Sequence, residues 1–210
     1  MEVLDLGLME YGACLERVQR LHADRVAGRV HDTLIVVEHP PVATLGRRGT
    51  PAEVFDPDLP VFAIERGGKA TYHAPGQLVL YPIMHLGTGN RDVRAFVRHL
   101  EAFVIHLLDD FGIPAVTRPE TPGVWTVKTG KKIASIGIAI RDWVTLHGIA
   151  LNVTLDPKEF ERIDPCGLGA AVMTNMQLEG ADIKMSAARK WVHEKAASEL
   201  AKFTPNAYHA

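Results

Sequence analysis

Apolar residues recur at every third or fourth position in three stretches of the chain, which is the spacing of the buried face of an amphipathic helix. The stretches are residues 10–28, 92–111 and 186–202. A polar residue at the start of the second, Asn90 or Asp92, can accept its first N–H groups, and Gly112 is suited to end it. Ser186 has the same capping position in the third. We therefore predict three helices.

Short runs rich in β-branched and aromatic residues lie between these stretches, bounded by Gly, Pro or polar residues, which is typical of strands. The predicted strands are 33–38, 61–65, 78–84, 124–127, 133–140 and 145–153. Thr129-Gly130 separates two of them and predicts a hairpin. Strands mixed with three helices predict an α/β or α+β fold, with parallel and antiparallel pairing both open. The length of 210 residues, without an internal linker, predicts one domain over residues 1–210.

Composition is that of an ordinary globular enzyme, with 47% hydrophobic and 23% charged residues. The net charge of -2 gives no sign of a nucleic-acid or anionic-membrane partner, although it does not exclude a local patch. Cys14 and Cys166 are too few and too far apart for a disulfide scaffold. Neither a membrane-spanning apolar run nor a basic, apolar leader is present in the sequence. We expect a cytoplasmic protein that does not associate with membranes.

The segment 66–77 carries glycines, a proline, an arginine and a histidine between two predicted strands, and we interpret it as a loop. Glycine allows positive φ and close approach of the backbone, so such a loop can hold a ligand or an oxyanion with its N–H groups. The alternative is an ordered connection with incidental polar residues. Loops of this length are usually functional or disordered, and the aromatic and basic content argues against disorder.

Two lysines begin the predicted strand that follows Gly130. Strict alternation places Lys132 with Ala134 and Ile136 on one face and Lys131 with Ile133 and Ser135 on the other. One lysine must therefore share a face with small or apolar residues, where its ammonium form is disfavoured and proton transfer is favoured. Two solvated lysines at a hairpin are the alternative.

Two further segments hold candidate chemistry. His147 and Asn152 flank an apolar run and are able to line a pocket, although this segment taken alone favours a structural histidine. Cys166 lies between Pro165 and Gly167, on a constrained turn rather than in an apolar stripe such as that of Cys14. A reactive cysteine needs a nearby cation or base, and Lys132, His73 and His147 are the candidates. The histidines have no metal-ligand spacing, so we expect no metal.

Taken together, these segments resemble the lipoyl(octanoyl) transferase family, the octanoyl-[acyl-carrier-protein]:protein N-octanoyltransferases. The matching pieces occur in the family's order over nearly the whole chain, and they are Arg66-Gly67-Gly68, Thr71-Tyr72-His73, Pro75-Gly76-Gln77, Tyr81-Pro82, Pro122-Gly123-Val124-Trp125, Lys132-Ile133-Ala134, Ile136-Gly137, His147-Gly148, Ala150-Leu151-Asn152 and Pro165-Cys166-Gly167. The resemblance implies a mixed β-sheet packed with helices, related to the catalytic module of biotin and lipoate protein ligases.

The resemblance also implies a mechanism. Cys166 would take an octanoyl group, or a lipoyl group, from acyl-carrier protein as a thioester and pass it to a lysine of a lipoyl domain. Lys132 would act as general base and acid. The acceptors would be the lipoyl domains of 2-oxoacid dehydrogenase subunits and the glycine cleavage H protein. The implied substrate-binding residues are Arg66, Gly67, Gly68, Tyr72, His73, Gly76, Gln77, Ser135, Ile136, Gly137, His147, Gly148 and Ala150.

One position departs from the family pattern, since Ala74 stands where the family usually has glycine. If position 74 needs positive φ, or if a ligand touches its backbone, the methyl group would reshape the acyl pocket and its chain-length preference. We expect a monomer without a cofactor. Three alternatives are an ATP-dependent lipoate or biotin protein ligase, a cysteine thioesterase, and a non-catalytic module that binds acyl carriers or lipoyl domains.

Overall fold

The computed structural model describes residues 1–87, 91–119, 121–165 and 169–203. Within them, seven strands form one sheet in the order β1-β2-β6-β10-β9-β8-β7. The strands are β1 (Glu2–Leu8), β2 (Thr33–Glu38), β6 (Gln77–Ile83), β7 (Ala115–Thr117), β8 (Gly123–Thr126), β9 (Lys132–Arg141) and β10 (Val144–Asn152). β1 pairs parallel with β2, and the remaining neighbours pair antiparallel. The sheet is therefore mixed, as predicted.

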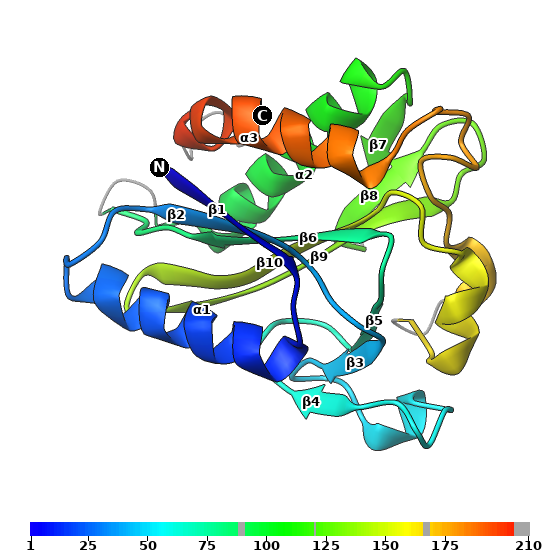
Figure 1. Ribbon diagram of the computed structural model, residues 1–210, viewed down its shortest axis with the longest axis horizontal. Coiled ribbons are helices and arrows are strands. Elements are labelled where there is room, and N and C mark those ends of the chain that lie inside the picture. The colour runs from blue at the N-terminus through cyan, green and yellow to red at the C-terminus, as the bar shows by residue number, and fades with distance from the viewer. Residues whose placement is uncertain (88–90, 120, 166–168, 204–210) are drawn as a thin grey trace.

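Helices cover both faces of this sheet, α1 (Tyr11–Val26) on one and α2 (Val93–Asp110) with α3 (Met185–Ala201) on the other (Figure 1). Under α1, Cys14 and Val18 pack against inward-facing residues of β2, β6 and β10. The larger core lies under α2 and α3 and includes Phe96, Leu107 and Trp191. Cys14 is 1% exposed, as expected for a structural cysteine.

A smaller sheet with the strand order β4-β3-β5 lies at one end of the molecule, near the start of α1 (Figure 1). Its strands are β3 (Val42–Leu45), β4 (Val61–Ala63) and β5 (Ala70–His73). β3 pairs parallel with β4 and antiparallel with β5. Two 3₁₀ turns, Pro157–Arg162 and Ala170–Val172, share an apolar cluster with this sheet. A third, Pro51–Glu53, contacts it through Glu53, which accepts the N–H of Ala70.

The three helices and most long strands agree with the predictions from the sequence. Asp92 caps α2 by accepting the N–H of Ala95 at 2.8 Å. Ser186 does not cap α3, because that helix begins one residue earlier, at Met185, and has Lys184 in the cap position. Asn90, the other cap that we considered for α2, lies outside the described residues.

The strands β1, β3, β5 and β7 were not predicted. The largest change is β5, which occupies the middle of the segment that we interpreted as one loop. Residues 70–73 form a strand there because β3, distant in the sequence, supplies hydrogen-bond partners for it. The predicted strand 61–65 ends earlier, at Ala63.

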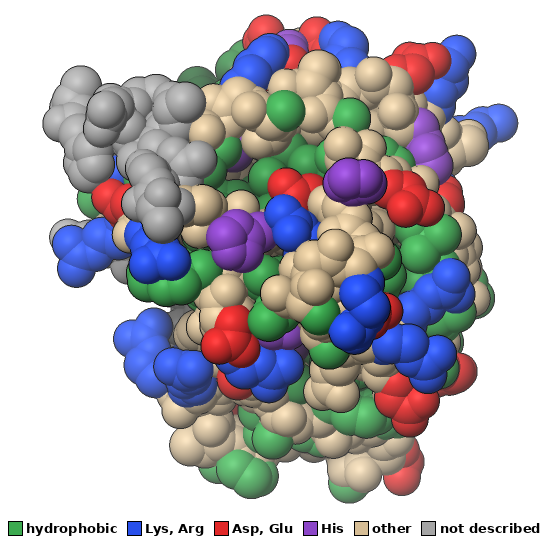
Figure 2. All heavy atoms as spheres, turned by 90° about the vertical axis from the view of Figure 1, so that its left-hand side faces the viewer, with side chains coloured by type: hydrophobic (Ala, Val, Ile, Leu, Met, Phe, Trp, Pro, Cys, Tyr) green, Lys and Arg blue, Asp and Glu red, His purple; other side chains and the backbone are tan. Residues whose placement is uncertain are grey.

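On the face drawn in Figure 2, Lys and Arg side chains occur together with Asp and Glu, and several Lys and Arg side chains gather at the lower left. Among the described residues, none of the helices has the length and apolar character needed to cross a bilayer.

Candidate active site

A cavity of about 500 Å³ lies between the glycine-rich segment 66–69, strands β9 and β10, and the first turns of α2. This volume is within the usual range for a small-molecule site. Its lining residues are Tyr11, Arg48, Ile64, Arg66, Gly67, Gly68, Lys69, Thr71, His73, Val79, Tyr81, Val93, Val97, Thr121, Pro122, Lys132, Ser135, Ile136, Gly137, Ile138, His147, Gly148, Ile149 and Ala150. Polar groups thus occur along a mainly aliphatic wall.

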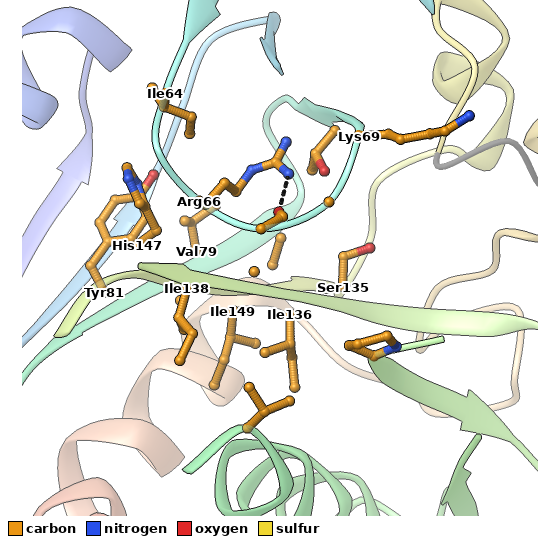
Figure 3. A pocket seen from close by; sticks show the side chains of 18 of the residues that line it. Ile64, Arg66, Lys69, Val79, Tyr81, Ser135, Ile136, Ile138, His147 and Ile149 are labelled. Carbon is orange, nitrogen blue, oxygen red and sulfur yellow. Dashed lines mark hydrogen bonds between the residues drawn. The ribbon is translucent and has the colours of Figure 1, made fainter. Parts of the chain in front are cut away.

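Most of the substrate-binding residues implied by the sequence line this cavity. They are Arg66, Gly67, Gly68, His73, Ser135, Ile136, Gly137, His147, Gly148 and Ala150, together with Lys132. In Figure 3, Ser135 extends to the side of the glycine-rich segment, whereas Ile136 and Ile149 extend to the side of α2. The cavity therefore has a polar wall on the side of the glycine-rich segment and an apolar wall on the side of α2, both contributed by β9 and β10.

The glycine-rich segment is held in place by the side chain of Arg66, which is only 6% exposed. Its guanidinium donates to the carbonyl oxygen of Gly67 at 2.9 Å, drawn as the dashed line in Figure 3, and to both the carbonyl and the hydroxyl oxygen of Thr44. The backbone N–H of Gly67 donates to the carbonyl of Ile138 at 3.1 Å. A Cβ atom on Gly46 would approach the carbonyl oxygen of Gly68 to 2.5 Å, so only glycine fits beneath the segment.

His147 has a left-handed backbone, with φ of 61°, inside β10. This conformation interrupts the strand's alternation, and the imidazole lies on the cavity side near Tyr81 (Figure 3). Burial lowers the pKa of His147 to about 4, against the opposing effect of Glu65, whose carboxylate is 3.7 Å from Nε2. The Nε2 atom is buried and has no hydrogen-bond partner among the described residues. A neutral imidazole therefore faces the cavity.

His73 is a second buried imidazole in the wall. Burial lowers its pKa to about 3. Its Nδ1 donates to Oε1 of Gln77 at 2.7 Å, because an amide oxygen is only an acceptor. Its ring stacks on that of Tyr11 with a centroid distance of 6.0 Å. This arrangement makes His73 a fixed, neutral part of the wall.

Lys132 is 3% exposed, whereas Lys131 is exposed. Strict alternation put Lys132 on the face of Ala134 and Ile136, and this prediction was wrong. Ala134 of β9 pairs with Val124 and Lys132 pairs with Trp125, so Ile133 is an extra residue that forms a β-bulge.

The bulge changes which side chains share a face. Ile133 joins Ala134 in the core under α2, and Lys132 joins Ser135 on the cavity side. The Nζ atom of Lys132 lies 5.8 Å from the centre of the Trp125 ring. The sequence correctly indicated that one of the two lysines lies among apolar groups. It did not indicate which face of the sheet that lysine is on.

A small hollow adjoins the cavity at Lys132. It is lined by Ala70, Thr71, Lys132, Ser135, Phe160, Pro165 and Met173. Pro165 precedes Cys166 in the sequence, and Cys166 itself lies outside the described residues. Pro165 and Lys132 thus line the same hollow.

Tyr72, Gly76 and Gln77 do not line the cavity. The Tyr72 hydroxyl donates to Glu159 at 2.7 Å. Gln77 Nε2 donates to Oδ1 of Asn152, at 3.0 Å, and to the carbonyl oxygen of Tyr72. These two side chains tie β5 and β6 to neighbouring segments behind the wall.

Gly76 has φ of 93°, and its carbonyl oxygen accepts three successive backbone N–H groups, those of Val153, Thr154 and Leu155. A Cβ atom there would lie 2.7 Å from the nitrogen of Leu155. Glycine at this position is therefore explained by a backbone packing requirement.

Ala74 does not have positive φ and does not line the cavity. Its side chain is 3% exposed and belongs to the apolar cluster of the small sheet with Leu155 and Phe160. The methyl group of Ala74 therefore neither strains the backbone nor shapes the cavity.

Residues of α2 near the cavity were not predicted as site residues. Val93 and Val97 line it, and Glu101 follows one turn later on the same row. Glu101 is 5% exposed, and its Oε1 accepts the N–H of Gly123 at 2.9 Å. The sequence feature that could have revealed Glu101 is its position as an acidic residue inside the apolar stripe of α2. Among the described residues, no group of His, Cys, Asp and Glu is arranged to hold a metal ion.

This geometry can be compared with that of known proteins. The model of the lipoyl protein ligase A/B catalytic domain matches residues 10–197. The chain belongs to this family. Within it, an octanoyltransferase of Syntrophotalea carbinolica is 46% identical over 187 residues, which are 89% of this chain and 88% of the relative. An octanoyltransferase of Geotalea uraniireducens is 39% identical over 98% of this chain and 95% of its own length.

Solved structures agree on the fold. A lipoate-protein ligase A bound with ATP superposes with a TM-score of 0.73 at 18% identity, covering 95% of this chain and 85% of the other. The biotin protein ligase from Aquifex aeolicus has a TM-score of 0.55 at 15% identity, covering 97% of this chain and 70% of the other. The predicted relation to the ligase module is confirmed. This member of the lipoyl protein ligase A/B family is an acyltransferase that acts in octanoyl or lipoyl transfer.

Proposed function

We propose that this chain, as one catalytic domain, transfers an octanoyl group from acyl-carrier protein to a lysine of a lipoyl domain through a thioester on Cys166. The observation that carries the proposal is the position of Lys132. Its buried side chain lies where the cavity meets the hollow that Pro165 also lines. Because Cys166 follows Pro165 in the sequence, this position of Lys132 supports its assignment as the base for a Cys166 nucleophile.

In the first half of the reaction, the Cys166 thiolate attacks the thioester carbonyl of the octanoyl carrier. A bond forms between the sulfur and the acyl carbon, and the carrier thiolate leaves and takes up a proton. The ammonium form of Lys132 favours the thiolate before the attack and is the proton donor to the leaving group.

In the second half, the amine of the acceptor lysine attacks the acyl carbon of the Cys166 thioester. The carbon–sulfur bond breaks, an amide forms, and the free amine of Lys132 accepts the proton that the acceptor loses. The cycle returns Cys166 as thiolate and Lys132 as ammonium, so it needs no nucleotide or cofactor.

The aliphatic wall supports an acyl substrate. Val79, Ile136, Ile138 and Ile149 are able to surround the octanoyl tail. Each buried methylene contributes about 0.8 kcal/mol, so the tail alone supplies several kcal/mol of binding. Arg66 and Gly68 line the polar side of the cavity, where the thioester oxygen needs hydrogen-bond donors.

The acceptors in this proposal are lipoyl domains of 2-oxoacid dehydrogenase subunits and the glycine cleavage H protein. This choice follows the octanoyltransferase relatives, and one structural neighbour is described as a lipoate protein ligase with its E2 lipoyl domain. Carrier and acceptor use the same acyl cavity in turn, which agrees with a single covalent intermediate.

The deciding experiment is intact-protein mass spectrometry after mixing the chain with octanoyl-carrier protein in the absence of acceptor and nucleotide. A mass increase of one octanoyl group, mapped to Cys166, is expected. Addition of a lipoyl domain should return the chain to its original mass and acylate the domain.

Other results would support the alternatives. Product formation only with ATP would identify a ligase. Loss of the acyl group to water at the same rate with and without a lipoyl domain would identify a thioesterase. Binding without any mass change would identify a non-catalytic module.

A further inference from the structure

Glu101 is a buried acid on a helix face that is otherwise apolar. It follows Val93 and Val97 on the row of α2 that lines the cavity, since residues four apart lie on the same side of a helix. Its side chain is 5% exposed. A carboxylate in such a position is costly unless it is hydrogen-bonded or paired with a positive charge.

The carboxylate of Glu101 has a direct backbone partner. Its Oε1 accepts the N–H of Gly123 at 2.9 Å. Gly123 lies against Lys132, because a Cβ atom built on this glycine would be 2.7 Å from Cε and 3.3 Å from Nζ of the lysine. One glycine therefore separates a buried carboxylate from the amine that we assign as the base.

The charges support the same connection. Burial raises the pKa of Glu101, whereas the Gly123 hydrogen bond and the positive charges of Arg98 and Lys132 lower it. The interaction is mutual, so a carboxylate that is stabilised by an ammonium group also stabilises that ammonium group. Arg98 lies on the preceding turn of α2, and its Nε is buried without a hydrogen-bond partner among the described residues.

Several other charged groups near Lys132 already have partners. The charged groups on the elements around Lys132 are Glu101 and Arg98 of α2, Arg118 on the Trp125 ring, and Arg48, Arg66 and Lys69, which line the same cavity as Lys132. Lys69 and Glu53 form an ion pair at 3.7 Å. The Arg118 guanidinium stacks 4.0 Å from the Trp125 ring centre and donates to the carbonyl of Gly130. Glu101 is the buried carboxylate of this set that reaches the lysine through one residue.

We propose that Glu101 is a positioning residue for acyl transfer: it holds the 121–123 segment against Lys132 and favours the ammonium form of that lysine. The inference rests on the proposed function. It assigns a task to a residue that touches neither the acyl group nor Cys166 in the proposed mechanism.

The test uses the second half-reaction, in which Cys166 is already acylated and the free amine of Lys132 acts as the base. Octanoyl-enzyme is prepared with octanoyl-carrier protein, freed of donor and mixed with a lipoyl domain from about pH 6 to about pH 11, a range that includes the ordinary lysine pKa of about 10.4. The single-turnover rate is fitted to a pH midpoint. The acceptor lysine is the same in every sample, so differences between variants come from the enzyme.

Glu101→Gln keeps an oxygen that can accept the Gly123 N–H, but it removes the charge. Loss of a nearby negative charge disfavours the ammonium form, so the midpoint should move to lower pH by about one unit. Glu101→Asp keeps the charge and should retain the wild-type midpoint. Glu53→Gln is the matched control, because Glu53 is also buried and accepts a backbone N–H, that of Ala70 at 2.8 Å. Its midpoint should not move.

Thermal unfolding of each variant is measured first, and Glu101→Met replaces Glu101→Gln if the latter does not fold. An unchanged midpoint in the charge-free variant, whatever its rate, would overturn the inference and leave Glu101 as a purely structural partner of Gly123. Failure of the wild-type chain to form an octanoyl-enzyme would instead reject the proposed function, so the two failures are distinguishable.

Discussion

Gly123 and Lys132 are packed so closely that no side chain fits between them. A Cβ atom on Gly123 would lie 2.7 Å from Cε of Lys132 and 2.5 Å from the carbonyl oxygen of Ala134, and the glycine has φ of 132°. We expect Gly123→Ala to cost about 1–3 kcal/mol of stability from backbone strain. Transfer should fall by a larger factor than stability alone explains, because the lysine must move.

Urea unfolding and transfer assays on the same preparations check this prediction. Gly87→Ala is the control, since a Cβ atom there meets no other atom within 4 Å and its φ is not positive. Normal transfer by Gly123→Ala would show that the contact with Lys132 is not required.

Cys166→Ser and Lys132→Ala should each lower octanoyl transfer at least ~10²-fold, which is the usual scale for loss of a nucleophile or an acid–base group. Lys131→Ala should transfer at nearly the wild-type rate, because Lys131 is exposed and is not part of the cavity wall. Steady-state assays with octanoyl-carrier protein and a lipoyl domain distinguish the three. Near-normal activity of either of the first two variants removes that residue from the mechanism.

Tyr72→Phe should affect stability rather than substrate binding. The Tyr72 hydroxyl contacts Glu159 and also accepts from Arg162 at 2.8 Å, and the residue does not line the cavity. Loss of this partly buried network should cost about 1 kcal/mol. The KM for octanoyl-carrier protein should stay unchanged, and a raised KM would restore Tyr72 as a substrate-binding residue.

Ala74→Gly introduces the residue that is usual in the family. Because Ala74 packs in the cluster of the small sheet and is absent from the cavity wall, the acyl chain-length profile should not change. Stability should fall by roughly 0.5–1 kcal/mol, the typical cost of glycine in place of alanine. Competition among hexanoyl-, octanoyl- and decanoyl-carrier proteins measures the profile, and a shifted preference would contradict this account.

Stability should decrease as the pH falls from neutral. Burial lowers the pKa of His73 from 6.5 to about 3, so the unfolded chain takes up a proton below about pH 6.5 that the folded chain does not bind. Stability is therefore fully present above the unfolded pKa and is lost between about pH 6.5 and about pH 3. From pH 7 to pH 5, this one group removes about 2 kcal/mol.

Urea unfolding of the wild type and of His73→Phe at the two pH values isolates this contribution. The variant should lose about 2 kcal/mol less than the wild type over the same interval. Equal losses in the two proteins would mean that His73 is able to bind its proton in the folded state.

Local sequence patterns were sufficient to predict the helices and strands whose buried residues recur at a regular spacing. α2 was predicted within one residue at each end because its apolar stripe and its Asp92 cap are local features. β5 was not predicted, since its four residues become a strand only through pairing with β3. β1 and β7 lie at the two edges of the large sheet, where their residues are exposed or half-buried and show no regular buried period.

The site shows the same division. Motif order indicated most of the cavity wall, but it did not separate residues that face the cavity, such as His73, from residues that support them, such as Gln77. The face of Lys132 depended on pairing with β8, which the sequence pattern does not encode. Glu101 has no short motif around it. Its contact with Gly123 depends on the packing of α2 against β8, which the sequence alone does not show.

The extra residue at Ile133 has a consequence for how such a site can arise or be lost. If Ile133 paired with Trp125 in a regular pleat, the Lys132 side chain would turn to the opposite side of the sheet, with every amino acid of the site still present in the sequence. The reactive arrangement therefore depends on the register of one strand as much as on the chemical identity of its residues.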